Sequence, residues 1–502
     1  MTRTAPPLAA LLALMCAALA LVIGANSSLS VALPDLAADL GATQTQLSYV
    51  VNAYALVFAA LLLPIGIAAD KYGRRSFLVA GLAVFGAASL ASAYVDSPEA
   101  VIVLRGVAGL GAAAVMPATL SVLVDAFPPE RRTFAVSVWA GVSGAGAMLG
   151  VLLSGVMLEF FWWGSVQVAY GVTAAVVAVV AVAVVPPSRN PALSLDAIGS
   201  VLALVGLFGL VLGVIEGPER GWSDPLTVGA LVVGVAALAG FVRYEATTPD
   251  PMLDVRLFRN PGLSAGSVLV FLQFFAAFGF FFLAPQFLQF VQGYDALGAA
   301  LRLLPLALGI GPASSFGPRL LERFGSRWVG AFGMGQMATA FTLFALLGDG
   351  PYWRFAVTLV VFGFGFGLAI TPGTQLIIDG LPADRRTLSA AVNDVTREVG
   401  GALGGAVAAS VLVAVYGAQL TTTGLPAPAA EAAEDGIASA LGVAGQLGPQ
   451  GAALVTSAQD AFTTGYAAAL LVGAAALLAG AVIGGLLAPQ RTTAPSEVEV
   501  PV

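Results

Sequence analysis

The sequence predicts an all-α polytopic membrane protein. Of its 502 residues, 58% are hydrophobic and only 10% are charged, whereas soluble domains carry roughly 25% charged residues. Runs of the about 20 apolar residues that a helix needs to cross the hydrocarbon layer recur along the whole chain. A transmembrane β-barrel is excluded, because its strands alternate apolar and polar residues over about ten positions.

Fourteen such runs predict fourteen transmembrane helices. They lie at about 8–33, 45–69, 76–95, 99–125, 133–158, 164–186, 193–215, 225–242, 262–291, 295–321, 326–347, 352–379, 387–416 and 461–487.

The residue types limit the chemistry that is open to this chain. Histidine is absent and Cys16 is the only cysteine, so no disulfide or cysteine metal cluster forms within the chain. Proton transfer must therefore use carboxylates, because no other side chain here ordinarily titrates near neutrality. The formal net charge of −7 gives no reason to expect a nucleic-acid partner. No nucleophile–base pair or phosphate-binding loop is visible, so we expect no enzyme and no cofactor.

The basic residues predict the orientation in the membrane, since cytoplasmic loops carry an excess of Lys and Arg. With fourteen spans and an internal N-terminus, 16 of the 21 basic residues fall on the inner side. Both termini are therefore expected in the cytoplasm. A long outer loop at about 417–460 is rich in Ala, Gly, Pro and Thr and is expected to be largely flexible, and the tail at 491–502 is expected to be disordered.

Two pairs of similar segments predict an internal repeat. "PIGIAADKYGRRS" from Pro64 aligns with "SFGPRLLERFGSRW" from Ser315, and "FPPERRTFAVSV" from Phe127 aligns with "LPADRRTLSAAV" from Leu381. The shifts are 252 and 254 residues, which indicates two homologous halves. We expect a six-helix half at 1–186, a linker with two extra spans at 187–257, and a second six-helix half at 258–490. Halves that face each other across a midplane cavity are typical of a rocking transporter; a duplicated bundle without transport is the alternative.

At this point the residues resemble a known family. The pattern G-x-x-x-D-K/R-x-G-R-R between the second and third runs is similar to the signature loop of the major facilitator superfamily. The fourteen runs, with "SYVVNAYALVFAALLLPIG", "VIEGPERGWSDP" and "SAAVNDVTREVGGALG", resemble its fourteen-span drug:proton antiporter branch, and "FWWGSV" resembles the subgroup that exports quaternary ammonium compounds and dyes. The resemblance covers about 8–487 and implies the major facilitator fold, a bacterial cell membrane, and multidrug or antibiotic efflux.

The signature loop is expected to act as the inner gate. Gly66 and Gly73 permit close helix contacts in lipid. Asp70 is placed to meet a helix N-terminus or an arginine of the other half. The alternative is that its cations only enforce topology. The gating residues are Gly66, Asp70, Lys71, Gly73, Arg74 and Arg75.

Ionisable groups inside spans are costly and usually functional. Arg105 lies in "LRGVAGLGAAA", which resembles the family's proton-coupling motif R-x-x-Q-G-x-G with Ala108 in place of Gln. Asp394, Arg397 and Glu398 in span 13 are spaced to share one helix face. We expect these four residues to carry proton coupling, with Asp394 as proton carrier or as counter-ion for a cationic substrate. A structural ion network is the alternative for both groups.

The substrate cavity is expected to be lined by polar and aromatic residues of spans 1, 2 and 9. Aromatic walls bind flat lipophilic cations, although lipid-facing Phe is the commoner explanation in span 9. The cavity residues are Asn26, Ser30, Asn52, Tyr54, Gln273, Phe278 and Gln286.

Two departures from the antiporter pattern leave a second function open. Ala25 stands where the branch commonly has a span-1 acid, and Val151 stands where its span-5 motif has Pro. The leading hypothesis is a proton-coupled exporter of lipophilic or cationic drugs that works by alternating access, as a monomer in the lipid bilayer. The second is a uniporter, or a carrier of an endogenous metabolite or lipid with weakened or absent proton coupling. A channel or a transport-dead sensor is a third class, which would not need the gating loop.

Overall fold

The computed structural model describes residues 8–188, 196–249, 251–347, 350–381 and 389–489, and its regular elements in these ranges are all helices. Thirteen helical stretches of the described residues are long and apolar enough to cross a membrane. A further helix, α5 (Pro129–Phe160), has 32 residues and coincides with the predicted fifth span. The predicted all-α membrane fold is confirmed.

The described residues form sixteen α-helices. The first eight are α1 (Leu8–Leu40), α2 (Gln44–Tyr72), α3 (Arg74–Ser92), α4 (Pro98–Ala126), α5, α6 (Gly164–Val184), α7 (Ala197–Arg220) and α8 (Pro225–Glu245). The others are α9 (Pro261–Gln286), α10 (Ala296–Arg302), α11 (Pro305–Leu347), α12 (Tyr352–Gly380), α13 (Ser389–Gln419), α14 (Ala427–Glu434), α15 (Ile437–Gln446) and α16 (Ala452–Leu487).

The helices form two compact units. Unit 1 comprises Met1–Asp254, Ala277–Leu304 and Gly401–Leu470, and unit 2 comprises Val255–Ala276, Pro305–Gly400 and Leu471–Val502. Helices α9, α13 and α16 each contribute one part to each unit. These bounds are not those of the predicted halves, so the division at 1–186, 187–257 and 258–490 stays a prediction.

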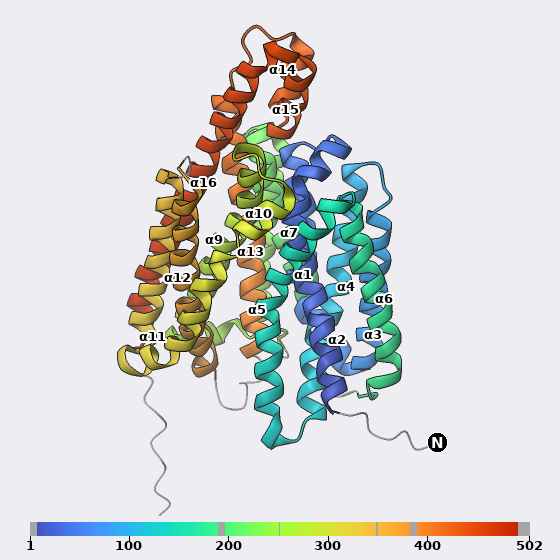
Figure 1. The fold of residues 1–502 in the computed structure, drawn as a ribbon. Helices are drawn as coiled ribbons and strands as arrows, with labels where there is room; N and C mark the ends of the chain where they lie inside the picture. Colours follow the sequence, from blue (N-terminus) through green and yellow to red (C-terminus); the bar gives the residue numbers. More distant parts are fainter. Residues whose placement is uncertain (1–7, 189–195, 250, 348–349, 382–388, 490–502) are drawn as a thin grey trace, which may run out of the picture. The chain divides into compact units, whose positions relative to one another are not determined.

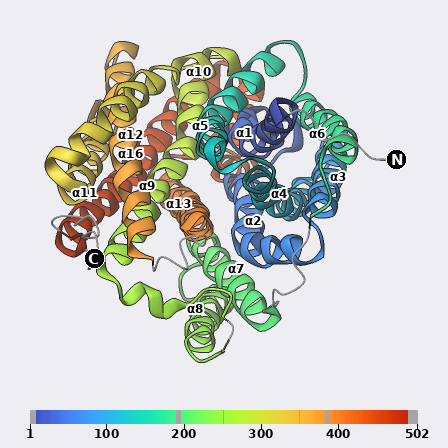
Figure 2. The ribbon, with the colours of Figure 1, turned by 90° about the horizontal axis from the view of Figure 1, so that it is seen from below.

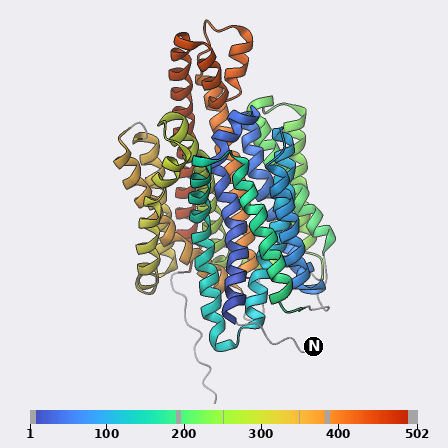
Figure 3. The same ribbon diagram turned by 45° about the vertical axis from the view of Figure 1, so that its right-hand side comes forward.

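Unit 1 is built on close helix pairs. Helix α1 packs along α5 (Figure 3), and α2 and α3 both pack on α4. The helices of the predicted insertion, α7 and α8, lie side by side at the edge of this unit, with α7 against α2 (Figure 2). Small residues permit these approaches: a Cβ on Gly111 of α4 would lie 2.6 Å from the carbonyl oxygen of Gly81 on α3.

Unit 2 is dominated by the packing of α11 on α12. Helix α11 contains two helices joined at Gly325, whose φ is 77°. Gly73, which the sequence repeat aligns with Gly325, also has a positive φ of 135° and separates α2 from α3. Both turns need glycine because other residues rarely adopt these angles.

The same shift of 254 residues aligns Gly150 with Gly404, and these two glycines pack alike. A Cβ on Gly150 of α5 would lie 2.7 Å from Cα of Gly24 on α1. In the same way, a Cβ on Gly279 of α9 would lie 3.2 Å from the carbonyl oxygen of Gly404 on α13. The predicted repeat pairs span 5 with span 13 and span 1 with span 9, so these contacts support it.

The predicted flexibility of the loop at about 417–460 is wrong. Helix α13 runs to Gln419, α14 and α15 form a helical pair, and α16 already begins at Ala452 (Figure 1). The Tyr416 hydroxyl donates to the Ala433 carbonyl over 3.2 Å. The Gln44 amide donates to the Asp435 carbonyl over 2.9 Å, which fixes the pair to the start of α2. Alanine is the best helix former, and its abundance here makes helices rather than a flexible loop.

Some expectations fall outside the described residues. For the predicted orientation, these are the basic residues at 3, 189, 385, 386 and 491. For the predicted tail and repeat, they are residues 491–502 and most of the segment "LPADRRTLSAAV".

Candidate functional site

The charged residues of α13 form an ion network in unit 2. Nε and Nη2 of Arg397 each lie 3.1 Å from Oε1 of Glu398, whereas Nη2 lies 3.8 Å from Oδ1 of Asp394. Arg397 is therefore hydrogen-bonded to Glu398 but not to Asp394, since 3.8 Å exceeds hydrogen-bond distance. The three side chains are only 13%, 6% and 15% exposed, in the order Arg397, Glu398 and Asp394. Asp394 is the acid that the arginine holds less tightly.

Aromatic and polar groups surround this network. The Arg397 guanidinium lies 5.6 Å from the centre of the Phe274 ring, a cation–π distance. Phe274 packs edge-on against Phe366 of α12 at 5.5 Å. Asn393, next to Asp394, accepts a hydrogen bond from Thr374 over 3.2 Å. The setting combines negative charge with aromatic surface, which is the chemistry that organic cations require.

Arg105 lies at the centre of a second group, in unit 1. It is 2% exposed, and its Nη2 donates to Oδ1 of Asn26 on α1 over 3.3 Å. Its Nε donates to the Val50 carbonyl of α2 over 3.3 Å, and its guanidinium lies 4.4 Å from the Tyr54 ring. Among the described residues, no carboxylate lies within ion-pair distance of Arg105. The predicted residues Asn26, Tyr54 and Arg105 thus meet, but their contacts are all neutral.

Of the remaining predicted cavity residues of unit 1, Asn52 and Phe278 contact groups other than Arg105. Ser30 is buried one turn after Asn26 on α1. Asn52 donates to the Ser48 carbonyl of its own helix over 2.9 Å, and its side-chain oxygen faces Gly405 of α13. The Phe278 ring lies against Gly401. None of these contacts shows a substrate, so their role in the cavity stays a prediction.

Two buried glutamines on α9 each have one amide oxygen without a hydrogen-bond partner among the described residues. Gln273 is in unit 2 and donates to the Phe366 carbonyl, and Gln286 is in unit 1 and donates to the Phe282 carbonyl, each over 2.8 Å. Buried acceptors are usually satisfied, so these two oxygens are exceptions, and their role in the substrate cavity stays a prediction. Just beyond Gln286, α9 passes into a π-helical turn, Phe287–Val291, a feature frequent at functional sites.

The predicted gating loop forms an ion cluster within unit 1. The Arg74 Nε lies 2.5 Å from Oδ1 of Asp70, and its Nη1 pairs with Asp125 at the end of α4. The partner of Asp70 in the structure is thus an arginine of the same loop. Gly66 lies against Pro117 of α4, where a Cβ would be 3.3 Å from the proline Cβ. Lys71 lies 5.5 Å from the Tyr72 ring, and Arg75 is half-buried.

Sequence reasoning missed a polar contact between α2 and the insertion. Glu216 of α7 is buried, accepts a hydrogen bond from the Tyr49 hydroxyl of α2, and pairs with Arg220 one turn later. The signal was present in "VIEGPERGW", which places an acid four residues before a base at the end of an apolar span. The contact attaches the two additional helices to α2.

Comparison with known proteins agrees with the sequence resemblance. The family model of the Major Facilitator Superfamily matches residues 15–405. The methyl viologen resistance protein SmvA of Salmonella typhimurium is 31% identical over 460 residues, which is 90% of this chain and 92% of the relative. The tetracenomycin C resistance and export protein of Streptomyces glaucescens is 30% identical, and the match covers 95% of this chain and 91% of the relative. The multidrug efflux pump LfrA of Mycolicibacterium smegmatis is 30% identical and covers 97% of both.

Solved structures show the same fold. A bacterial homologue of the human lysosomal transporter Spinster, in an inward-facing, unoccupied conformation, aligns with a TM-score of 0.71 at 17% identity, covering 96% of this chain and 98% of that one. The nucleoside transporter NupG aligns with a TM-score of 0.61 at 12% identity, covering 95% and 99%.

Proposed function

The chain belongs to the major facilitator superfamily, and we propose that it exports lipophilic, cationic drugs or antibiotics in exchange for protons. It is a multi-pass secondary transporter related to drug and antibiotic resistance exporters, not an enzyme. The proposal adds proton coupling and the substrate class. It also adds that the protein is a monomer, that it works by alternating access, and that both termini lie in the cytoplasm.

The α13 network is the observation that carries the proposal. It contains two acids and one arginine, so with both acids ionised it has a net charge of −1. Arg397 compensates Glu398 directly, while Asp394 lies 3.8 Å away. A single positive charge, either a proton on Asp394 or an organic cation beside it, would make the network neutral. Because both bind for the same electrostatic reason, each would displace the other, which is the basis of antiport.

The substrate class follows from the same surroundings. Phe274 and Phe366 provide aromatic surface beside the acids, and aromatic faces attract cations more strongly when water is excluded. The relatives include a methyl viologen resistance protein, and methyl viologen is an aromatic dication. Others are named for tetracenomycin C and puromycin, which extends the expectation to aromatic antibiotics.

The signature loop is proposed as the inner gate. Arg74 joins the end of α2, through Asp70, to the end of α4, through Asp125. These contacts hold two helix ends together in one state, and the change between inward- and outward-facing states would rearrange them. Loss of Asp70 should therefore slow transport without changing which substrate binds.

A carrier with weak or absent proton coupling is the second candidate. It is favoured by the neutral partners of Arg105, because Ala25 and Asn26 provide no carboxylate where the antiporter branch commonly has one. Such a protein would move its substrate, an endogenous metabolite or lipid, only down the substrate's own gradient.

Transport in liposomes tests the proposal. Purified protein is reconstituted with an imposed proton gradient, and ethidium movement and lumenal pH are followed together. The proposal expects ethidium to move against its gradient with a matching proton flux in the wild type. In D394N both should be lost. D379N is the matched control, because Asp379 is an exposed acid on α12 of the same unit.

The outcomes separate the two candidates. Ethidium that moves only down its own gradient, with no proton flux, supports the uncoupled carrier. Normal coupled transport by D394N would remove the α13 acid from the proposal.

A further inference from the structure

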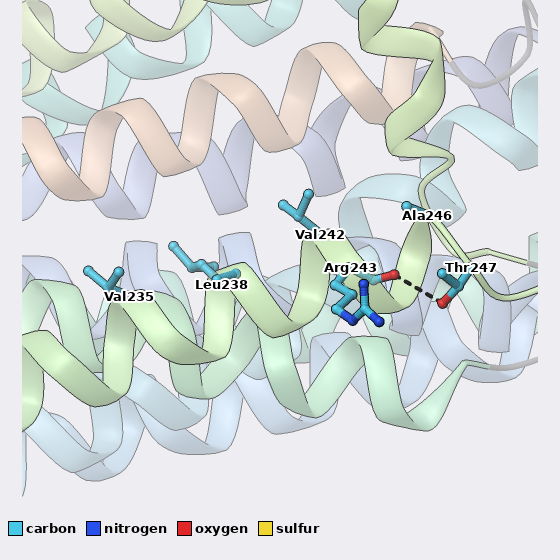
Figure 4. Close-up of a pocket in the computed structure, with 7 residues that line it drawn as sticks. Val235, Leu238, Val242, Arg243, Ala246 and Thr247 are labelled. Atoms are coloured by element: carbon cyan, nitrogen blue, oxygen red, sulfur yellow. Dashed lines mark hydrogen bonds between the residues drawn. The ribbon is translucent and has the colours of Figure 1, made fainter.

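A hollow runs along one face of α8, away from the residues described above (Figure 4). It has a volume of about 630 Å³ and is lined by Val235, Leu238, Ala239, Val242, Arg243, Ala246 and Thr247. These positions recur every three or four residues, so they form a single stripe on the helix. The small side chains of Ala239 and Ala246 leave space between the larger ones.

The stripe has the length of one membrane leaflet. From Val235 to its end at Glu245 the helix rises about 15 Å at 1.5 Å per residue, and half of the hydrocarbon layer is also about 15 Å thick. Its first part is apolar and exposed, with Val235 59% and Val242 52% exposed. Its last part carries the only charge of the lining, on Arg243. The stripe is therefore apolar toward the middle of the membrane and cationic at its end.

Arg243 has no acid partner among the described residues. The nearest acid in sequence, Glu245, is fully buried and accepts a hydrogen bond from the Leu253 amide over 3.0 Å. Thr247 donates its hydroxyl hydrogen to the Arg243 carbonyl over 3.0 Å (Figure 4), so it has no proton left for a ligand. The guanidinium of Arg243 is therefore the group of the lining that can bind an anionic ligand.

We propose that this stripe, the α8 groove, binds an anionic phospholipid of the inner leaflet. One acyl chain lies along Val235, Leu238 and Val242, and the phosphate pairs with Arg243. Lys and Arg near a helix end reach the interface with their charged heads, and the predicted orientation places this end of α8 on the cytoplasmic side, where anionic lipids attract basic residues. A cationic drug would be repelled by Arg243, so the groove is distinct from the proposed transport site.

Native mass spectrometry of the purified full chain in detergent tests this directly. The probes are phosphatidylglycerol and phosphatidylcholine with the same acyl chains. We expect the wild type to retain phosphatidylglycerol about fivefold better than phosphatidylcholine, which is the gain from one arginine near the surface. R243Q should abolish that preference, and A239L, which fills the hollow, should reduce binding of both lipids.

R259Q is the matched control, because Arg259 is also an exposed arginine on the predicted inner side but lies outside the groove. It should bind both lipids as the wild type does. The proposal is overturned if R243Q keeps the preference, or if R259Q loses it to the same extent. It is also overturned if A239L removes a dimer signal rather than lipid, because the groove would then be a contact between two copies.

Discussion

Arg105 and Arg397, two arginines with little exposed surface, have opposite surroundings. Arg397 in unit 2 lies between two carboxylates, whereas Arg105 in unit 1 contacts an amide, a carbonyl and an aromatic ring. A buried charge is costly unless it is paired, so the two residues cannot have the same role. The α13 network can gain or lose a proton and return to neutrality. The Arg105 group has no acid among its contacts in the described residues, so we expect it to position helices α1, α2 and α4 rather than to carry a proton.

The largest expected effect comes from removing the paired arginine. R397Q leaves Asp394 and Glu398 buried together without a cation, and breaking a buried ion pair in this way costs on the order of 3–5 kcal/mol. R105Q removes a charge that has no acid partner among the described residues, so it should lower the stability of the protein less than R397Q does. Thermal unfolding of the two variants in detergent should show a clearly lower midpoint for R397Q. R397K, which keeps the charge, should fall between R397Q and the wild type. A lower midpoint for R105Q than for R397Q would contradict the comparison.

Placing an acid beside Arg105 should change the stability of the protein less than R397Q does, and in the opposite direction. Aspartate has nearly the shape of asparagine, so N26D would place a carboxylate about where the Asn26 oxygen now accepts from Arg105. A hydrogen bond to a charged group contributes about 1.5–3 kcal/mol, and the unfolding midpoint should rise. S30D is the control, since it adds an acid one turn away that has no arginine and should lower the midpoint. A midpoint that falls in N26D would show that the charge of Arg105 is already compensated.

The smallest effect is expected at Tyr54. Y54F keeps the ring over the Arg105 guanidinium and removes the hydroxyl bond to the Val22 carbonyl, which is 3.0 Å long. The free energy of unfolding should fall by about 1 kcal/mol in Y54F. Y54L also removes the cation–π contact and should destabilise further. Equal midpoints for Y54F and Y54L would show that the ring contributes nothing to the burial of Arg105.

The sequence predicts the membrane helices and the α13 network well, because both depend on local patterns. Apolar runs of about 20 residues have one stable form in lipid, and residues three and four apart on a helix must share a face. The shared face of Asp394, Arg397 and Glu398 follows from spacing alone.

Contacts that depend on packing between helices could not be predicted in the same way. Nothing in the spacing of Arg74 shows that it reaches Asp125, which lies 51 residues away. The proximity of Asn26 and Arg105 likewise requires the packing of α1 beside α4. The loop at 417–460 was misjudged for another reason: its low aromatic content suggested disorder, although its alanines favour helix.

The most direct test of the central claim, that Asp394 exchanges a proton for a cationic substrate, is proton release on binding. Ethidium is added to purified protein in weakly buffered detergent solution with a pH indicator. The wild type and D379N should release protons as ethidium binds, whereas D394N should release none and should bind ethidium more weakly, because its α13 network is already neutral. Equal proton release from D394N and the wild type would contradict the claim and assign the exchange to another acid.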